Sequence, residues 1–303
     1  MLSSEDVRAV RERLGAVGVW MGSLLGPAPI DEERRAARRI EELGYGSLWT
    51  GEIVGGKEAF AHQSVLLAAT EHLVTGTGIA NVWSRQPGVM EGGASTLGAA
   101  YPGRFVLGIG VSHGPIVELS GQTYMKPMGK MERYLDGMDE AVVYGPATEV
   151  PVPRVLAALR PKMLSLARDR ADGAHPYLVP AAHSALARAA IGPDKLLIPE
   201  QAVVLESDPA EARRIAREHL SGYLRLPNYV NNLKHLGYAG DLDDGGSDRL
   251  VDAIVAWGSE EDIANRVSEH HDNGADHVVL QPLGDIATAV AQLERLAPVL
   301  LGG

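Results

Sequence analysis

Eight short apolar runs, each followed by a segment of helical periodicity, constrain the fold of this chain more than any other feature. Strands that alternate with helices pair in parallel through right-handed crossovers. Eight such units favour a closed (β/α)8 TIM barrel, a single domain over residues 1–303, rather than an open doubly wound sheet. The expected strands lie at residues 17–21, 47–50, 73–81, 104–110, 152–158, 174–179, 196–205 and 277–282.

Two segments interrupt this alternation. Residues 111–129 are expected to form a long loop before a helix at residues 131–143. Residues 227–248 are polar and rich in Asn, Gly and Asp, and the strand–helix alternation resumes after them. We therefore interpret residues 227–248 as an insertion segment or lid on the barrel rather than as a linker between domains.

Glycines gather at the ends of the third and fourth expected strands. Gly76 and Gly78 interrupt one strand, and Gly108 and Gly110 close the other. A glycine within a strand often marks a place where another group approaches the backbone closely. Because barrel enzymes bind ligands at the C-terminal ends of their strands, these glycines are candidates for a ligand site. His113 follows the fourth strand, and an imidazole there exchanges protons near neutral pH.

Charge and cysteine content limit the partners of the chain. A net charge of −11 argues against nucleic acid and against an anionic membrane surface, but it does not bear on a small-molecule substrate, which is the partner we expect, because a binding site makes its own local field. The absence of cysteine removes disulfides, thiolate nucleophiles and sulfur-ligated metals, and it fits a cytoplasmic location. Neither a secretory signal nor an apolar run long enough to span a membrane is present.

Three motifs suggest other activities but lack the context that each requires. Residues 51–57 match GxxxxGK, yet Glu58 stands where a nucleotide-binding loop has Ser or Thr. Residues 110–114 match GxSxG, so a serine hydrolase acting through Ser112 is an alternative, although Pro115 and a long loop follow in place of a helix. The histidines form no HExxH and no i,i+4 pair, and no metal site is expected.

Four segments taken together resemble the bacterial luciferase-like superfamily, in its branch of coenzyme F420-dependent oxidoreductases. They read EELGYGSLWTGE, LLAATEHLVTGTGIANVWSRQP, YPGRFVLGIGVSHG and LRPKMLSLARDRADGAHPYLVP. The resemblance extends over roughly residues 17–300 in the expected order. It implies a luciferase-like barrel, often a homodimer, with the deazaflavin F420, or FMN as in some relatives, across its C-terminal mouth.

The resemblance also implies roles for particular residues. It places a non-prolyl cis peptide at Gly78–Ile79, behind the cofactor ring, with His113 as the candidate for proton transfer and Glu52 as a second catalytic candidate. The cofactor-binding residues that it implies are Glu52, Gly78, Ile79, Ala80, Asn81, Val111 and Ser112 around the ring, with Gly173, Ala174, His183 and Ser184 at the phosphate tail.

The function implied is the transfer of a hydride between F420 and an organic substrate. The alternatives are an FMN-dependent monooxygenase that uses oxygen and a barrel that binds its cofactor without turnover. Ile53 departs from the family pattern, because several relatives have a histidine directly after the acidic residue at the end of the second strand.

Overall fold

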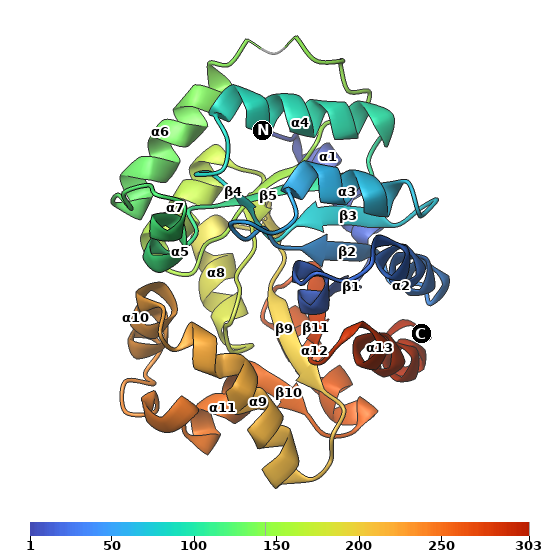
Figure 1. Ribbon diagram of the computed structural model, residues 1–303, viewed down its shortest axis with the longest axis vertical. Coiled ribbons are helices and arrows are strands. Elements are labelled where there is room, and N and C mark those ends of the chain that lie inside the picture. The colour runs from blue at the N-terminus through green and yellow to red at the C-terminus, as the bar shows by residue number, and fades with distance from the viewer. Residues whose placement is uncertain (143, 303) are drawn as a thin grey trace.

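The computed structural model describes residues 1–142 and 144–302 and shows a parallel β-barrel surrounded by helices (Figure 1). All strand pairs in the sheet are parallel, in the order β10-β9-β11-β1-β2-β3-β5-β6-β7-β8, with β4 paired to β5. The strands are β1 Val17–Trp20, β2 Ser47–Thr50, β3 Val74–Thr77, β4 Ala80–Asn81, β5 Phe105–Gly110, β6 Arg154–Leu156, β7 Gly173–Ala174, β8 Leu196–Leu197, β9 Glu200–Val204, β10 Val255–Trp257 and β11 Val278–Pro282.

The barrel closes through β8 and β9, which are two parts of one extended stretch. On one side, the Ile198 N–H donates a 3.0 Å hydrogen bond to the Ala174 carbonyl of β7. On the other side, the Val279 N–H of β11 donates a 3.0 Å bond to the Pro199 carbonyl. The barrel wall therefore consists of eight strand positions, and the (β/α)8 fold predicted from the sequence is confirmed.

Helices cover the outside of this wall, and α1 packs below it. Val7, Val10 and Leu14 of α1 belong to one buried cluster with Trp49 and Val279 of the barrel strands, so they help to fill the N-terminal end of the barrel. The α-helices are α1 Ser4–Leu14, α2 Ile30–Glu42, α3 Ala59–Leu67, α4 Pro87–Ala100, α5 Gly114–Leu119, α6 Pro127–Asp139, α7 Pro161–Arg170, α8 His183–Ile191, α9 Pro209–Tyr223, α10 Pro227–His235, α11 Asp248–Ile254, α12 Glu260–Asp272 and α13 Ile286–Leu301.

Several element boundaries differ from those predicted. The expected loop at residues 111–129 contains α5, whose second residue is Pro115, a position where a helix needs no backbone donor. The helix predicted at residues 131–143 begins earlier, at Pro127, and residue 143 lies outside the described part of the chain. The strand predicted at residues 174–179 shortens to β7, since Pro176 has no N–H to continue the ladder.

The segment at residues 227–248 is more ordered than a plain polar loop. It holds α10 and the short helix η2, Asp243–Gly245. Strand β10, which was not predicted, follows at Val255–Trp257 and pairs with β9. At three residues it is too short for an alternation pattern to indicate it.

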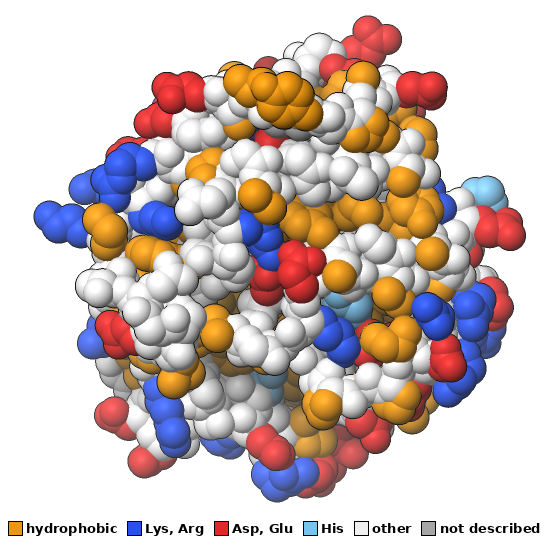
Figure 2. Space-filling view, turned by 45° about the horizontal axis from the view of Figure 1, so that its top comes forward, with side chains coloured by type: hydrophobic (Ala, Val, Ile, Leu, Met, Phe, Trp, Pro, Cys, Tyr) orange, Lys and Arg blue, Asp and Glu red, His pale blue; other side chains and the backbone are white. Residues whose placement is uncertain are grey.

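Charged side chains of both signs are interspersed on the face shown in Figure 2, and hydrophobic side chains form scattered patches there. Among the described residues, no helix is both long enough and apolar enough to cross a membrane.

Candidate active site

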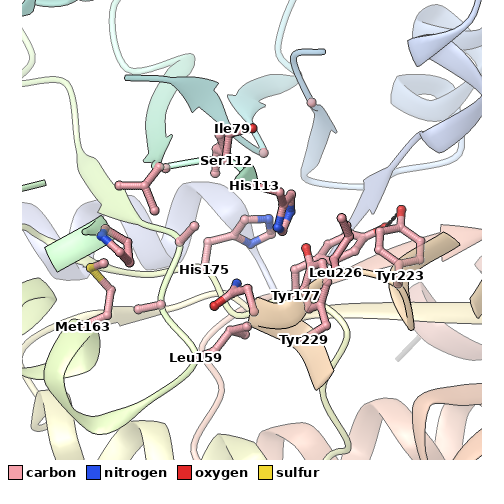
Figure 3. Close-up of a pocket in the computed structure, with 18 of the residues that line it drawn as sticks. Ile79, Ser112, His113, Leu159, Met163, His175, Tyr177, Tyr223, Leu226 and Tyr229 are labelled. Carbon is pink, nitrogen blue, oxygen red and sulfur yellow. Dashed lines mark hydrogen bonds between the residues drawn. The ribbon is translucent and has the colours of Figure 1, made fainter. Parts of the chain in front are cut away.

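A cavity of about 720 Å³ opens at the C-terminal ends of the barrel strands. Residues that follow β2, β3, β5, β6 and β7 line it, and residues of α9 and α10 complete it (Figure 3). The position agrees with the general rule that barrel enzymes place their sites at this end, and the volume is that of a pocket for a small molecule or cofactor.

Six of the residues implicated by the sequence line this cavity, namely Glu52, Gly78, Ile79, Val111, Ser112 and His113. Ala80 and Asn81 do not line it: both are buried in β4, and the Asn81 N–H donates a 2.7 Å bond to Glu52 Oε2. The structure therefore brings the ends of β2, β3 and β5 together around one space, as the glycines of β3 and β5 and the resemblance at Glu52 implied.

The end of β3 is packed too tightly for a side chain. The Gly78–Ile79 peptide is cis, as the resemblance implies. The Trp20 indole N–H donates a 3.2 Å hydrogen bond to the Gly78 carbonyl. A Cβ at Gly78 would fall on Trp20 Nε1 and 3.1 Å from His175 Nε2. Glycine at this position thus permits an indole ring and an imidazole to approach the backbone.

His175 is a cavity residue that the sequence did not indicate. Its Nδ1 lies 2.7 Å from the Ile198 carbonyl, which can only accept, so the hydrogen is on Nδ1 and Nε2 is an acceptor. Burial lowers the pKa of His175 to about 4, which keeps the ring neutral at pH 7. Nε2 is buried without a hydrogen-bond partner among the described residues. A ligand that offers an N–H or O–H group would satisfy it.

His113 lies where the sequence placed it, directly before α5 and against the cavity. Its ring centre is 5.0 Å from that of Tyr229. Burial lowers the pKa of His113 to about 4, and its Nδ1 is buried without a partner among the described residues. The imidazole is therefore neutral at pH 7 and can accept a hydrogen bond, although the lowered pKa makes it a weaker base than a free histidine.

Glu52 is held in an ion pair that the sequence did not reveal. Its Oε1 pairs with Arg85 Nη2, and its Oε2 accepts from Arg85 Nη1 at 3.0 Å and from the Asn81 N–H. The side chains of Glu52 and Arg85 are each only 6% exposed. Because both carboxylate oxygens are engaged, the arrangement favours a role for Glu52 in holding the loop before α4 over a role in proton transfer.

The residues implied for a phosphate tail lie away from the cavity. Gly173 and Ala174 are buried in the barrel wall, beside β8. His183 Nε2 contacts the Leu159 carbonyl at 2.7 Å, and Ser184 Oγ contacts His270 Nδ1 at 2.8 Å. Their placement gives these four residues no direct access to a ligand in the cavity.

The start of α7 is better placed to receive an anion. Arg160 precedes the helix, and Pro161 and Lys162 open it, and all three line the cavity. Helix N-termini attract anions because their first N–H groups are unpaired and the helix dipole is positive there. The signal was present in the sequence as LRPKM, but its position at the cavity required the fold.

The structure does not support the other activities that the GxxxxGK and GxSxG motifs suggested. The Lys57 ammonium donates to the carbonyls of Leu24 and Gly26 at 2.7 and 2.6 Å and pairs with Glu33, so it is committed to the protein rather than to a phosphate. Over the described residues, Ser112 Oγ forms no hydrogen bond to a histidine. No group of three or more His, Asp or Glu side chains is placed to hold a metal within residues 1–142 and 144–302.

Comparisons with known proteins agree with the fold. The sequence profile described as luciferase-like monooxygenase matches residues 14–277. The 5,10-methylenetetrahydromethanopterin reductase of Methanolobus tindarius is 22% identical over 299 residues, which covers 84% of this chain and 92% of that protein.

Two solved structures share the fold. An F420-dependent secondary alcohol dehydrogenase, in complex with an F420–acetone adduct, has a TM-score of 0.75 at 14% identity and covers 94% of this chain and 98% of its own. The oxygenating constituent of 3,6-diketocamphane monooxygenase from Pseudomonas putida, in complex with FMN, has a TM-score of 0.65 at 14% identity and covers 94% and 98% respectively.

Proposed function

The chain belongs to the luciferase-like monooxygenase family, and on that premise we propose that it is an oxidoreductase that passes a hydride between coenzyme F420 and an organic substrate. The proposal depends mainly on one part of the cavity lining, formed by Gly78, Ile79 and His175, which we call the cavity floor. There the backbone at Gly78 and Ile79 faces the cavity beside the unpartnered acceptor His175 Nε2. A flat ring that carries an N–H or O–H group fits such a floor.

The residues that would hold the cofactor follow from the lining of the cavity. Gly78, Ile79, Val111 and Ser112 would support the ring, and His175 Nε2 would accept a hydrogen bond from it. The start of α7, with the cation of Lys162, would receive the phosphate tail. When bound, a 5-deazaflavin supplies a carbon centre that exchanges hydride rather than single electrons.

The protein then has to orient the substrate and transfer one proton to or from it. An alcohol that loses a hydride from carbon also loses a proton from oxygen, and the reverse reaction takes both back. We propose His113 for this proton, because its imidazole lines the cavity and its Nδ1 has no hydrogen-bond partner among the described residues. Its lowered pKa keeps the neutral form, which has a free acceptor nitrogen, present at pH 7.

Titration with both cofactors tests the proposal. Quenching of tryptophan fluorescence should show F420 binding at least about tenfold tighter than FMN, because F420 carries carboxylates beyond its phosphate that the cations at α7 would also attract, whereas FMN ends at its phosphate. Arg160→Ala and Lys162→Ala should each weaken F420 binding, more so at low salt. Arg168→Ala, at the exposed far end of the same helix, is the matched control and should leave the affinity unchanged. Absence of F420 binding would refute the proposal.

An FMN-dependent monooxygenase is the second candidate, supported by the fold shared with an FMN-bound monooxygenase. The same titration separates the two. Tight binding of FMN with weak binding of F420, together with oxygen consumption by the FMN-loaded protein, would favour the monooxygenase.

A further inference from the structure

Five aromatic rings form a continuous wall on one side of the cavity. We call this the aromatic wall, and its members are Trp20, His113, Tyr177, Tyr223 and Tyr229. Ring centres are 5.3 Å apart for Trp20 and Tyr177, 5.5 Å for Tyr177 and Tyr223, and 5.4 Å for Tyr223 and Tyr229. Figure 3 shows the three tyrosines gathered together with His113 beside them.

Hydrogen bonds fix part of the aromatic wall. The Tyr177 hydroxyl donates to Gln281 Oε1 at 2.8 Å and lies 2.7 Å from the Tyr223 hydroxyl. Two of the three tyrosine hydroxyls are therefore joined to each other and to β11. What these two residues offer to a ligand is chiefly the surface of their rings rather than free donors.

The aromatic wall carries no negative charge that would attract a cation. Glu200 is buried beside it, and its Oε2 accepts a 3.0 Å bond from the Leu178 N–H, next to Tyr177. Burial raises the pKa of Glu200 to about 8, so this carboxyl is uncharged at pH 7. Glu52 lines the cavity but is paired with Arg85. Arg160 and Lys162, which form no ion pair within residues 1–142 and 144–302, also line it. The charges thus oppose a cationic ligand.

The faces of aromatic rings attract both cations and other π systems, and the positive charges of Arg160 and Lys162 in the cavity leave π systems as the favoured partner. Aromatic rings prefer tilted or offset contact with other π systems, at centre distances of about 4.5–7 Å, and such pairs gain more than their buried area alone explains. A saturated group of equal size would bury the same area without that gain.

We propose that the aromatic wall binds a planar, unsaturated and uncharged or anionic ring of the substrate, so that the substrate class is aromatic or conjugated cyclic compounds rather than saturated ones. The inference rests on the proposed function in that the ring would lie beside the cofactor. The wall itself is formed by the chain's own side chains.

A matched pair of probes tests the proposal. 2-Naphthol and decahydro-2-naphthol share a carbon skeleton and a hydroxyl group but differ in their π system. Their affinities are measured by calorimetry on the protein with and without saturating F420. The wild-type protein should bind 2-naphthol about tenfold or more tightly than decahydro-2-naphthol, with F420 present as well as absent.

Substitutions locate the binding to the wall. Tyr229→Leu removes one ring and should weaken 2-naphthol about fivefold to tenfold, while Tyr229→Phe keeps the ring and should stay within about twofold. Tyr238→Leu makes the same change at a tyrosine that is not among the cavity-lining residues and should have no effect. The ratio between the two probes on the wild-type protein does not depend on how any variant folds.

Four outcomes would overturn the inference: equal affinity for the two probes, no binding of either, loss of 2-naphthol binding when F420 saturates the site, or an unchanged affinity in Tyr229→Leu. F420 affinity is measured separately on the same samples. Failure of F420 to bind while the probe preference persists would refute the proposed function and leave the substrate-class inference standing.

Discussion

Replacement of Gly78 by alanine should destabilise the protein and weaken F420 binding together. Gly78 lies outside the left-handed backbone region, so an alanine meets no conformational penalty there. The added Cβ would instead lie on Trp20 Nε1 and 3.0 Å from Trp20 Cδ1, and the buried indole would have to move by roughly 1 Å.

The size of the effect follows from these contacts. Overpacking of a core costs about 1–3 kcal/mol, and loss of the bond from Trp20 Nε1 to the Gly78 carbonyl leaves a buried donor at a cost of about 1–3 kcal/mol. The gain from a stiffer unfolded chain is about 0.4–1 kcal/mol. The expected net loss in the free energy of unfolding is about 1–5 kcal/mol, with a central value of about 3 kcal/mol.

Urea unfolding, followed by circular dichroism, measures this loss. Gly92→Ala is the matched control, because Gly92 lies inside α4 and a Cβ there meets no atom within 4 Å. It should be neutral or stabilise the protein by up to about 1 kcal/mol. The double variant Gly78→Ala with Trp20→Phe should lose less than the sum of the single variants. A Gly78→Ala protein within 0.5 kcal/mol of wild type would refute the packing assigned to this floor.

Three further predictions concern the charged and titratable groups of the site. His113→Ala should lower turnover by about a hundredfold while F420 affinity changes less than threefold, and unchanged turnover in a stopped-flow assay would remove His113 from the mechanism. Lowering the pH from 6.5 towards 4 should destabilise the fold, because buried His175 stays neutral with a pKa of about 4 while the unfolded chain takes up a proton near 6.5. For this residue, the free energy of unfolding should fall by up to about 1.4 kcal/mol for each unit by which the pH is lowered. This pH dependence should be smaller by the same amount in His175→Phe, as urea unfolding at each pH would show. Glu52→Gln should lower the free energy of unfolding by about 2–4 kcal/mol, because it leaves buried Arg85 with one charged partner. Glu58→Gln, at a side chain that is 51% exposed, should lower it by less than about 1 kcal/mol in the same assay.

The barrel and its floor were predictable because their signals are local. Alternating strands and helices indicated the eight-fold closure, and glycines at the ends of β3 and β5 indicated where a ligand could approach the backbone. His113 was predictable for the same reason, since it directly follows a strand end in a glycine-lined segment. The family resemblance added the cis peptide at Gly78–Ile79, which the structure contains.

The parts that were missed depend on contacts between distant segments. Arg85 reaches Glu52 across 33 positions of the sequence, and no short motif joins them. The aromatic wall takes its tyrosines from α9, α10 and the segment after β7, so only the folded chain assembles it. His175 was missed because it lay inside a predicted strand. In the structure β7 ends before Pro176, and the chain that follows reaches the cavity.

The residues implied for the phosphate tail are not among those that line the cavity. The small residues Gly173 and Ala174 serve the close approach of β7 to β8, where a Cβ on Gly173 would lie 2.6 Å from Leu196 Cβ. The α7 start, with Arg160 and Lys162, reaches the cavity in their place. A lid formed by residues 227–248, a homodimer and a cytoplasmic location stay predictions.

A crystal structure of the protein soaked with F420 would show whether the cavity holds the cofactor as proposed. We expect the deazaflavin ring against the Gly78–Ile79 peptide, a donor of the ring within hydrogen-bond distance of His175 Nε2, and the phosphate at the start of α7. A ring bound elsewhere, or His175 Nε2 left without a partner beside a bound ring, would contradict the account.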